Sequence, residues 1–257
     1  MKTPITKSPN RNSKAPLSLS GMITLFQRPE ENISYRLVTC RDDYLKVLNL
    51  RRESYSHGGK IEENAPLKNL ICPTDRLSEI VMAFQDDVLV ASASLFLPHS
   101  ENAVLDTQRT APPGHAKDFP AKTDCIEISR LCILPDYQGK GTFNTFISEI
   151  YRRSLLSGRR YVISSSSPTL IPLYRRLGFK ATDINYPHPD LLQIPHTIIV
   201  LDLHWPLSGW RISPKIWQKY YKCGSQKAPP SYYYNMPKLY KMCLMLQTII
   251  AVFISAR

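Results

Sequence analysis

The sequence lacks the residue patterns of metal and disulfide sites. Its six cysteines include no CxxC pair, and its six histidines include no HExxH pattern. Zinc sites and disulfide-stapled domains depend on such spacings. We therefore expect no metal, no permanently bound cofactor and no disulfide framework, and the free thiols favour a cytoplasmic location.

The sequence also lacks a long hydrophobic run. Near the N-terminus there is only a broken apolar patch at residues 22–26, which is too short for the core of a secretion signal. The apolar stretch Met242–Ile254 spans about 13 residues, whereas a membrane-spanning helix needs about 20. We expect no segment that crosses a membrane.

Acidic residues are absent from both ends of the chain. Residues 1–28 contain five Lys or Arg and residues 203–257 contain eight, whereas residues 29–204 carry 20 basic and 21 acidic residues. The net charge of +12 therefore belongs to the ends, and it does not by itself indicate nucleic-acid binding. We expect a disordered basic leader over 1–28, one folded domain over 29–204 and a C-terminal extension over 205–257.

The C-terminal extension is both basic and aromatic. It contains Trp205, Trp210, Trp217 and the run Tyr232–Tyr234 before the apolar stretch 242–254. Aromatic rings, lysines and a short apolar segment suit a peripheral contact with the inner face of a membrane. A terminal helix packed on the core explains the same pattern equally well.

The pattern of the middle region predicts an α/β domain with a mixed, mostly antiparallel sheet flanked by helices. Asp86–Asp87 separates two β-rich runs and predicts a hairpin turn, and Asp42 is a candidate N-cap for the first helix. The expected strands are 35–40, 79–85, 88–97, 125–134, 161–164, 179–184 and 197–204, and the expected helices are 42–55, 142–157 and 168–177.

A glycine-containing loop lies between an expected strand and a long helix. Gln138, Gly139, Lys140 and Gly141 directly precede the helix that begins near Thr142. Backbone N–H groups and the helix dipole favour an anion at such a position, and Lys140 adds positive charge. The loop is therefore a candidate phosphate site, although an ordinary turn has the same composition.

A second motif strengthens the prediction that this loop binds phosphate. The segment 173–179, Leu-Tyr-Arg-Arg-Leu-Gly-Phe, follows about 35 residues later, and together residues 127–181 resemble the GNAT superfamily of acyltransferases. The resemblance implies a sheet with a central splayed strand pair. It also implies that Gln138 and Gly141 bind the phosphate of an acyl carrier and that Tyr174 protonates the departing thiolate.

Two further segments resemble one branch of that superfamily, the N-acyl amino acid synthases of FeeM type and the autoinducer synthases. They are Leu50–Tyr55 and Glu127–Leu131. Enzymes of this branch move long fatty acyl groups from acyl carrier protein to an amine. The residues that match its motifs on the acceptor side and the central strand are Arg51, Tyr55, Asp75, Glu127 and Arg130.

The chain departs from these patterns at three positions. Cys72 stands where the branch has an Asp, and Ser94 stands near an Arg of the homoserine lactone synthases. Both lie on the acceptor side and favour a plain amino acid over S-adenosylmethionine. Phe143 replaces a Gly or Ala of the phosphate loop, which weighs against a full coenzyme A diphosphate.

The resemblance implies an N-acyltransferase that joins a fatty acyl group, carried by acyl carrier protein or coenzyme A, to the amine of an amino acid. Glu127 accepts or relays the proton of the amine, and the backbone near Ile133 polarises the thioester carbonyl. Tyr174 donates a proton to the leaving sulfur. Alternatively, Glu127 and Arg130 form a structural ion pair and Tyr174 is a core aromatic. The rival functions are a homoserine lactone synthase, a short-chain acetyltransferase and a non-catalytic acyl-carrier or membrane-binding module.

Clustered arginines suggest a protein partner. Arg152, Arg153, Arg159 and Arg160 lie on or just after the helix that follows the phosphate loop. Such a surface attracts an acidic partner, and we expect acyl carrier protein to bind there. No nucleic-acid module is recognisable.

Overall fold

The computed structural model describes residues 33–112, 119–209, 212–222 and 236–255. The predicted leader 1–28, Trp210 and Tyr232–Tyr234 lie outside the described residues.

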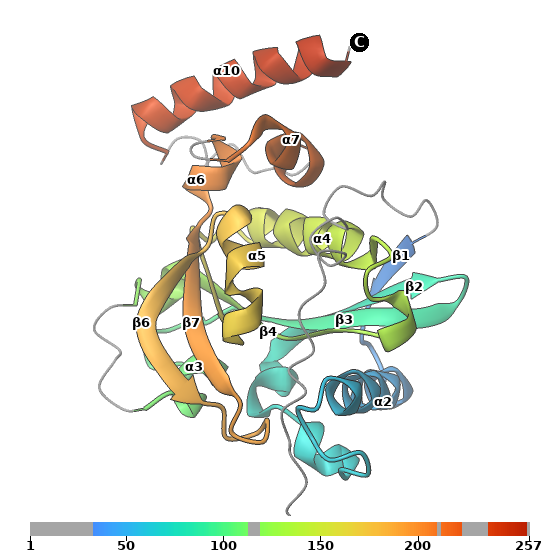
Figure 1. Cartoon of the computed structure of the whole chain (residues 1–257). Helices are drawn as coiled ribbons and strands as arrows, with labels where there is room; N and C mark the ends of the chain where they lie inside the picture. The colour runs from blue at the N-terminus through green and yellow to red at the C-terminus, as the bar shows by residue number, and fades with distance from the viewer. Residues whose placement is uncertain (1–32, 113–118, 210–211, 223–235, 256–257) are drawn as a thin grey trace, which may run out of the picture.

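The strands of the described chain form one mixed sheet, in the order β1-β2-β3-β4-β5-β7-β6 (Figure 1). Neighbouring strands are antiparallel except β4 and β5, which are parallel. The predicted mixed, mostly antiparallel sheet is therefore confirmed. The strands are β1 (Ile33–Leu37), β2 (Ser78–Gln85), β3 (Val88–Phe96), β4 (Cys125–Ile133), β5 (Tyr161–Ser166), β6 (Lys180–Pro187) and β7 (Pro195–Asp202).

The hairpin between β2 and β3 turns where the sequence predicts it. Asp86 and Asp87 have φ values of 49° and 63°. Two consecutive left-handed residues match the twist of the strands they join, and Asp tolerates this conformation better than most residues. This tight turn fixes the pairing of β2 with β3.

Helices cover both faces of the sheet (Figure 1). Helix α2 (Arg41–His57) packs on one face, and α4 (Thr142–Leu156) and α5 (Ile171–Arg176) pack on the other. The further helices and helical turns are η2 (Leu67–Leu70), η3 (Pro73–Leu77), α3 (Asp106–Thr110), η5 (Lys122–Asp124), η6 (Pro135–Tyr137), η7 (Pro168–Leu170), α6 (His204–Leu207), α7 (Pro214–Ile216), η8 (Trp217–Tyr221) and α10 (Lys238–Ser255).

Helix α2 begins two residues earlier than a cap at Asp42 would place it. Cys40, not Asp42, is the N-cap, and it makes no side-chain capping bond. Asp42 and Asp43 instead lie in the first turn, where their charges favour the positive end of the helix dipole. Asp43 also pairs with Arg36 of β1. The prediction of Asp42 as the N-cap was therefore wrong.

The parallel strands β4 and β5 pair over three residues only and then separate. Their pairing ends at Glu127 and Ile163. Beyond that point β4 stays paired with β3, and its register shifts because an extra residue is inserted near Arg130, whose φ is 53°. A bulge of this kind bends a strand and redirects a side chain. The splayed strand pair that the family resemblance implies is present.

The first part of the predicted C-terminal extension belongs to the core. Trp217, Tyr220 and Tyr221 are almost fully buried. The ring of Tyr221 stacks on Tyr151 of α4 at 5.0 Å, and its hydroxyl donates to the Leu177 carbonyl at 2.6 Å. Residues 205–209 and 212–222 therefore complete the domain, because their aromatic rings cover α4.

Helix α10 packs on this core through Tyr240 and Leu244 and exposes other apolar side chains. No helix among the described residues is both long and apolar enough to span a bilayer. The exposed apolar residues of α10 are Leu239, Met242, Met245, Leu246, Ile249 and Ile250.

Candidate active site

A pocket lies where β4 and β5 separate. Residues 128–131 of β4 form one wall, and residues 164–167 at the end of β5 form the opposite wall. The other residues that line it come from the α2 side, from α3, from the η7–α5 segment and from the β6–β7 hairpin: Tyr55, Lys60, Asp106, Thr107, Leu170, Tyr174, His188, Leu191 and His196. The splay thus brings together residues that are distant in sequence.

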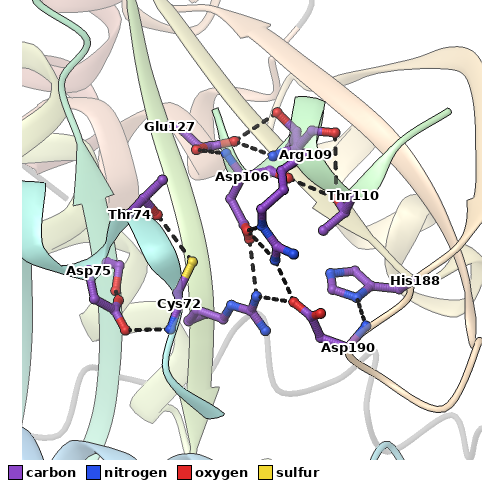
Figure 2. A network of polar contacts seen from close by, with 12 residues as sticks. Cys72, Thr74, Asp75, Asp106, Arg109, Thr110, Glu127, His188 and Asp190 are labelled. Carbon is purple, nitrogen blue, oxygen red and sulfur yellow. Dashed lines mark hydrogen bonds and ion pairs between the residues drawn. The ribbon is translucent and has the colours of Figure 1, made fainter. Parts of the chain in front are cut away.

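Glu127 stands at the base of the splay and is fully buried. One carboxylate oxygen accepts a bond from the Asp106 N–H at 2.7 Å, and the other accepts bonds from the N–H and hydroxyl of Thr107 at 2.8 and 2.7 Å (Figure 2). Burial raises the pKa of Glu127 to about 7, and the nearby Asp106 acts in the same direction. Glu127 itself does not line the pocket. Its hydrogen-bond partner Thr107 does, and connects the carboxylate to the pocket.

The bonds to Glu127 also hold helix α3, which the sequence did not predict. Its residues Asp106 and Arg109 form a charged cluster with Arg130 and Asp190 (Figure 2). Arg130 bonds Asp190 at 2.8 Å and Asp106 at 3.3 Å. The ion pair of Glu127 with Arg130, which was the structural alternative, is not among the ion pairs of the described residues. Two arginines and two aspartates neutralise one another here.

Tyr174 lines the same pocket from α5. Its ring packs edge-on against Phe179 at 5.3 Å, so the aromatic body belongs to the core. Burial raises the pKa of Tyr174 to about 12, which keeps the hydroxyl protonated near neutral pH. The residue therefore combines a packing role with a proton donor at the pocket wall.

The predicted phosphate loop precedes α4. Gly139 and Gly141 have φ values of 79° and 97°, a conformation that favours glycine, and Gly141 is the N-cap residue. Gln138 donates from its side chain to the Ile133 carbonyl at 3.0 Å, whereas Lys140 is exposed. The first N–H groups of a helix have no partner within it, so this N-terminus is suited to an anion.

The backbone of Ile133 faces the open side of β4. The next residue, Leu134, donates its N–H to Val90 of the β3 strand at 2.9 Å. Successive N–H groups of a strand point to opposite edges, so the Ile133 N–H points away from β3 and toward the splay. A donor at this edge is what a thioester carbonyl requires.

Arg51 and Asp75, which we predicted on the acceptor side, form a buried pair that does not line the pocket. The Arg51 guanidinium bonds the two Asp75 oxygens at 2.7 and 3.0 Å, the Ser94 hydroxyl at 2.8 Å and the Leu70 carbonyl at 3.1 Å. Tyr44 donates a further bond to Asp75 at 2.7 Å. Of the predicted acceptor-side residues, only Tyr55 and Arg130 line the pocket itself.

The four arginines predicted to bind carrier protein lie toward the other end of α4. Arg152 and Arg153 both bond Glu149, and Arg160 pairs with Asp202. A helix rises about 1.5 Å per residue, so Arg152 is about 15 Å from the phosphate loop along α4. Arg159 donates to the Pro98 carbonyl. Their role toward a carrier protein stays a prediction.

Several pocket residues had no signal in the sequence. Lys60, Thr107, His188 and His196 all line the pocket but belong to irregular segments, to the short helix α3 or to the β6–β7 hairpin. Their proximity depends on long-range packing that local patterns do not encode. Among the described residues, no cluster of potential metal ligands occurs.

Comparison with known proteins agrees with this arrangement. None of the curated proteins matches the chain by sequence. The structure of FeeM, an N-acyl amino acid synthase from uncultured soil microbes, shares 12% identity with a TM-score of 0.50 and covers 77% of this chain and 99% of its own. A GNAT superfamily phosphinothricin acetyltransferase from Sinorhizobium meliloti, in complex with acetyl-CoA, shares 17% identity with a TM-score of 0.48 and covers 66% of this chain and 88% of its own.

The sequence match defines the family. The family model of the N-acyl amino acid synthase FeeM matches residues 46–202, which is more than half of the chain. The matched region contains the splayed strands, the phosphate loop and Tyr174. The chain is therefore an acyltransferase that belongs to the FeeM family of N-acyl amino acid synthases.

Proposed function

We propose that this protein transfers a long-chain fatty acyl group from the thioester of acyl carrier protein to the amine of a free amino acid. The observation that carries the proposal is the pocket between β4 and β5. A proton-accepting path, Thr107 to Glu127, and a proton donor, Tyr174, meet there beside the splayed backbone of β4.

The donor enters from the phosphate loop. The phosphate of its pantetheine arm binds the N-terminus of α4 near Gly139 and Gly141, and Lys140 contributes charge. The arm then runs along the open edge of β4, where the Ile133 N–H donates to the thioester carbonyl. Such a path explains why β4 and β5 separate after Glu127 rather than pair along their full length.

The chemical step follows from the residues at the pocket wall. The acceptor amine passes a proton to the Thr107 hydroxyl, which passes its own proton to the Glu127 carboxylate. The free amine attacks the thioester carbon, and the developing oxyanion is stabilised at β4. The carbon–sulfur bond then breaks, the Tyr174 hydroxyl protonates the leaving thiolate, and the attacking nitrogen gives its excess proton back to the Tyr174 oxygen. The products are an amide and a free thiol.

Acyl carrier protein is our preferred donor because three basic groups near the pocket have no acidic partner among the described residues. Arg175 and Arg176 are exposed on α5, next to Tyr174, and Lys140 is exposed on the loop. None of the three forms an ion pair within the described part of the chain. A surface of this charge steers an acidic carrier protein toward the arm-binding cleft.

The proposal extends to the membrane surface through α10. Six exposed apolar residues lie along this helix, Lys238 and Lys241 lie in its first turn, and residues 203–257 contain no acid. An amphipathic basic segment of this kind binds anionic lipid. Peripheral attachment would place the enzyme where an amphiphilic product can leave.

Lipid extraction from cells that express the chain tests the function. We expect mass spectrometry to detect N-acyl amino acids that are less abundant in cells expressing the Tyr174→Phe variant at equal level. Fragmentation identifies both the acyl chain and the amino acid. A folded, expressed protein that produces no new lipid would favour a non-catalytic binding module instead.

A further inference from the structure

One cation in the pocket has no counterion. Lys60 follows α2 and lines the pocket beside Tyr55, with its ammonium 5.5 Å from the centre of the Tyr55 ring. It is partly buried and forms no ion pair among the described residues. Burial lowers the pKa of Lys60 from its usual value, as expected for an ammonium that has lost water without gaining a carboxylate.

The nearby acids cannot serve as that counterion, because each already has one. Asp106 pairs with Arg109 and Arg130, and Asp190 pairs with the same two arginines. The cluster is therefore neutral as a unit. Glu127 lies behind Thr107 and does not line the pocket. Among the residues that line the pocket, no carboxylate is therefore left to pair with Lys60.

The two histidines of the pocket add no charge. His196 Nδ1 is 3.0 Å from the Ile194 carbonyl, which can only accept, so Nδ1 carries the proton. His188 Nδ1 accepts from the Asp190 N–H at 3.2 Å. Burial lowers the pKa of His188 to about 4 and lowers that of His196 as well, and Arg130 acts in the same direction on both. Lys60 thus shares the pocket with two neutral histidines.

A second donor in the pocket also lacks an acceptor. The Nε–H of Arg130 is buried and has no hydrogen-bond partner, although the terminal nitrogen Nη2 bonds Asp106 and Asp190. A buried donor without a partner costs about 1–3 kcal/mol unless a ligand or water satisfies it. Lys60 and Arg130 both line the pocket, so it holds an ammonium without a carboxylate and a guanidinium with one unsatisfied N–H.

We propose that Lys60 binds the carboxylate of the amino acid acceptor, with the Arg130 Nε–H as a second donor. The inference rests on the proposed acyl transfer and names the residue that selects its substrate. The acceptor amine then lies toward Thr107, which lines the same pocket. The site favours α-amino acids over amines, amino acid amides and the N-termini of peptides, which lack this carboxylate.

A comparison of acids with amides tests the assignment. Each of the twenty amino acids is first offered to the purified full chain with lauroyl acyl carrier protein, and the best acceptor is then compared with its carboxamide. We expect wild type to prefer the acid at least 10-fold in kcat/KM. Lys60→Met should raise the KM for the acid by about 10- to 100-fold, with the kcat and the KM for the amide little changed. Lys60→Arg should retain the preference.

A matched control is Lys46→Met, because Lys46 is exposed on α2 and does not line the pocket. It should behave as wild type. If Lys60→Met lowers activity on acid and amide equally, or leaves the preference intact, the carboxylate assignment is wrong.

Calorimetric titration of the acid and the amide separates this inference from the proposed function. Transfer to acid and amide with equal efficiency in wild type would refute the subsite while the acyltransferase function stands. If wild type binds the acid but transfers no acyl group, and Lys60→Met abolishes this binding, the proposed function is refuted while the subsite stands. If wild type shows neither binding of the acid nor acyl transfer, both the subsite and the proposed function are refuted.

Discussion

Replacement of Arg51 by Met distinguishes a structural residue from an acceptor ligand. Arg51 is fully buried, and its guanidinium holds Asp75, Ser94 and the Leu70 carbonyl together. Met fills a similar volume but leaves the Asp75 carboxylate buried without its cation. Breaking one side of a buried ion pair costs about 3–5 kcal/mol.

The expected loss is large enough for a simple assay. In a domain of this size, 1 kcal/mol corresponds to about 2–4 °C in Tm, so we expect Arg51→Met to lower the Tm by roughly 6–20 °C. Urea unfolding followed by tryptophan fluorescence gives the free energy directly, because Trp217 is buried in the core. The control is Arg52→Met, whose exposed bond to Asn49 should contribute less than about 1 kcal/mol.

The pH dependence of the stability is a second test of the Arg51–Asp75 ion pair. Burial opposes the ionisation of Asp75, but the bonds from Arg51 outweigh it and lower the pKa of this carboxyl below its usual value. A lowered pKa contributes stability above about pH 4 that is lost as the pH falls through the folded-state pKa. Wild type should therefore lose more stability on acidification than Arg51→Met. An Arg51→Met protein as stable as Arg52→Met, with only its acceptor KM raised, would refute the structural assignment.

Three further outcomes are expected. Tyr174→Phe removes only a hydroxyl and should lower kcat by at least about 10-fold with the Tm unchanged; an unchanged kcat would leave Tyr174 as a core aromatic. Because burial raises the pKa of Glu127 to about 7, wild-type kcat/KM should rise as the pH passes 7. The kcat/KM of Glu127→Gln should be about 10²-fold lower than that of wild type and should recover only at high pH. A raised folded-state pKa also means that wild type loses stability relative to Glu127→Gln as the pH rises from about 4.5 through 7; parallel stability curves would contradict the burial of this carboxyl. Deletion of residues 238–257 should retain activity and weaken sedimentation with anionic liposomes, and equal sedimentation would leave α10 as ordinary packing.

Local sequence patterns were sufficient to predict the main strands and helices of the fold. Apolar alternation located the strands of the β2–β3 hairpin, and Asp86–Asp87 located their turn, because the conformation of a two-residue hairpin depends on the turn residues themselves. The start of α4 after the glycine loop was likewise predictable, since Gly141 and the apolar face of α4 are adjacent in the chain.

The candidate site was only partly predictable because residue type does not determine burial. Arg51 and Asp75 match a motif, yet they form a buried ion pair with each other and do not line the pocket. Helix α3 is too short to show a period, and it forms because Glu127 accepts its first N–H groups. Lys60 is an ordinary lysine in the sequence, and only the fold shows that it lies without a counterion beside two neutral histidines.

Single-turnover acyl transfer tests the central claim most directly. Purified protein in excess over lauroyl acyl carrier protein is mixed with the amino acid that it binds, and the free carrier thiol and the N-lauroyl amino acid are quantified over time. Acyl transfer as proposed predicts that one amide forms for each thiol released, at equal rates. Thiol release without the amide, or no release by folded protein, would contradict the assignment of this chain as an N-acyl amino acid synthase.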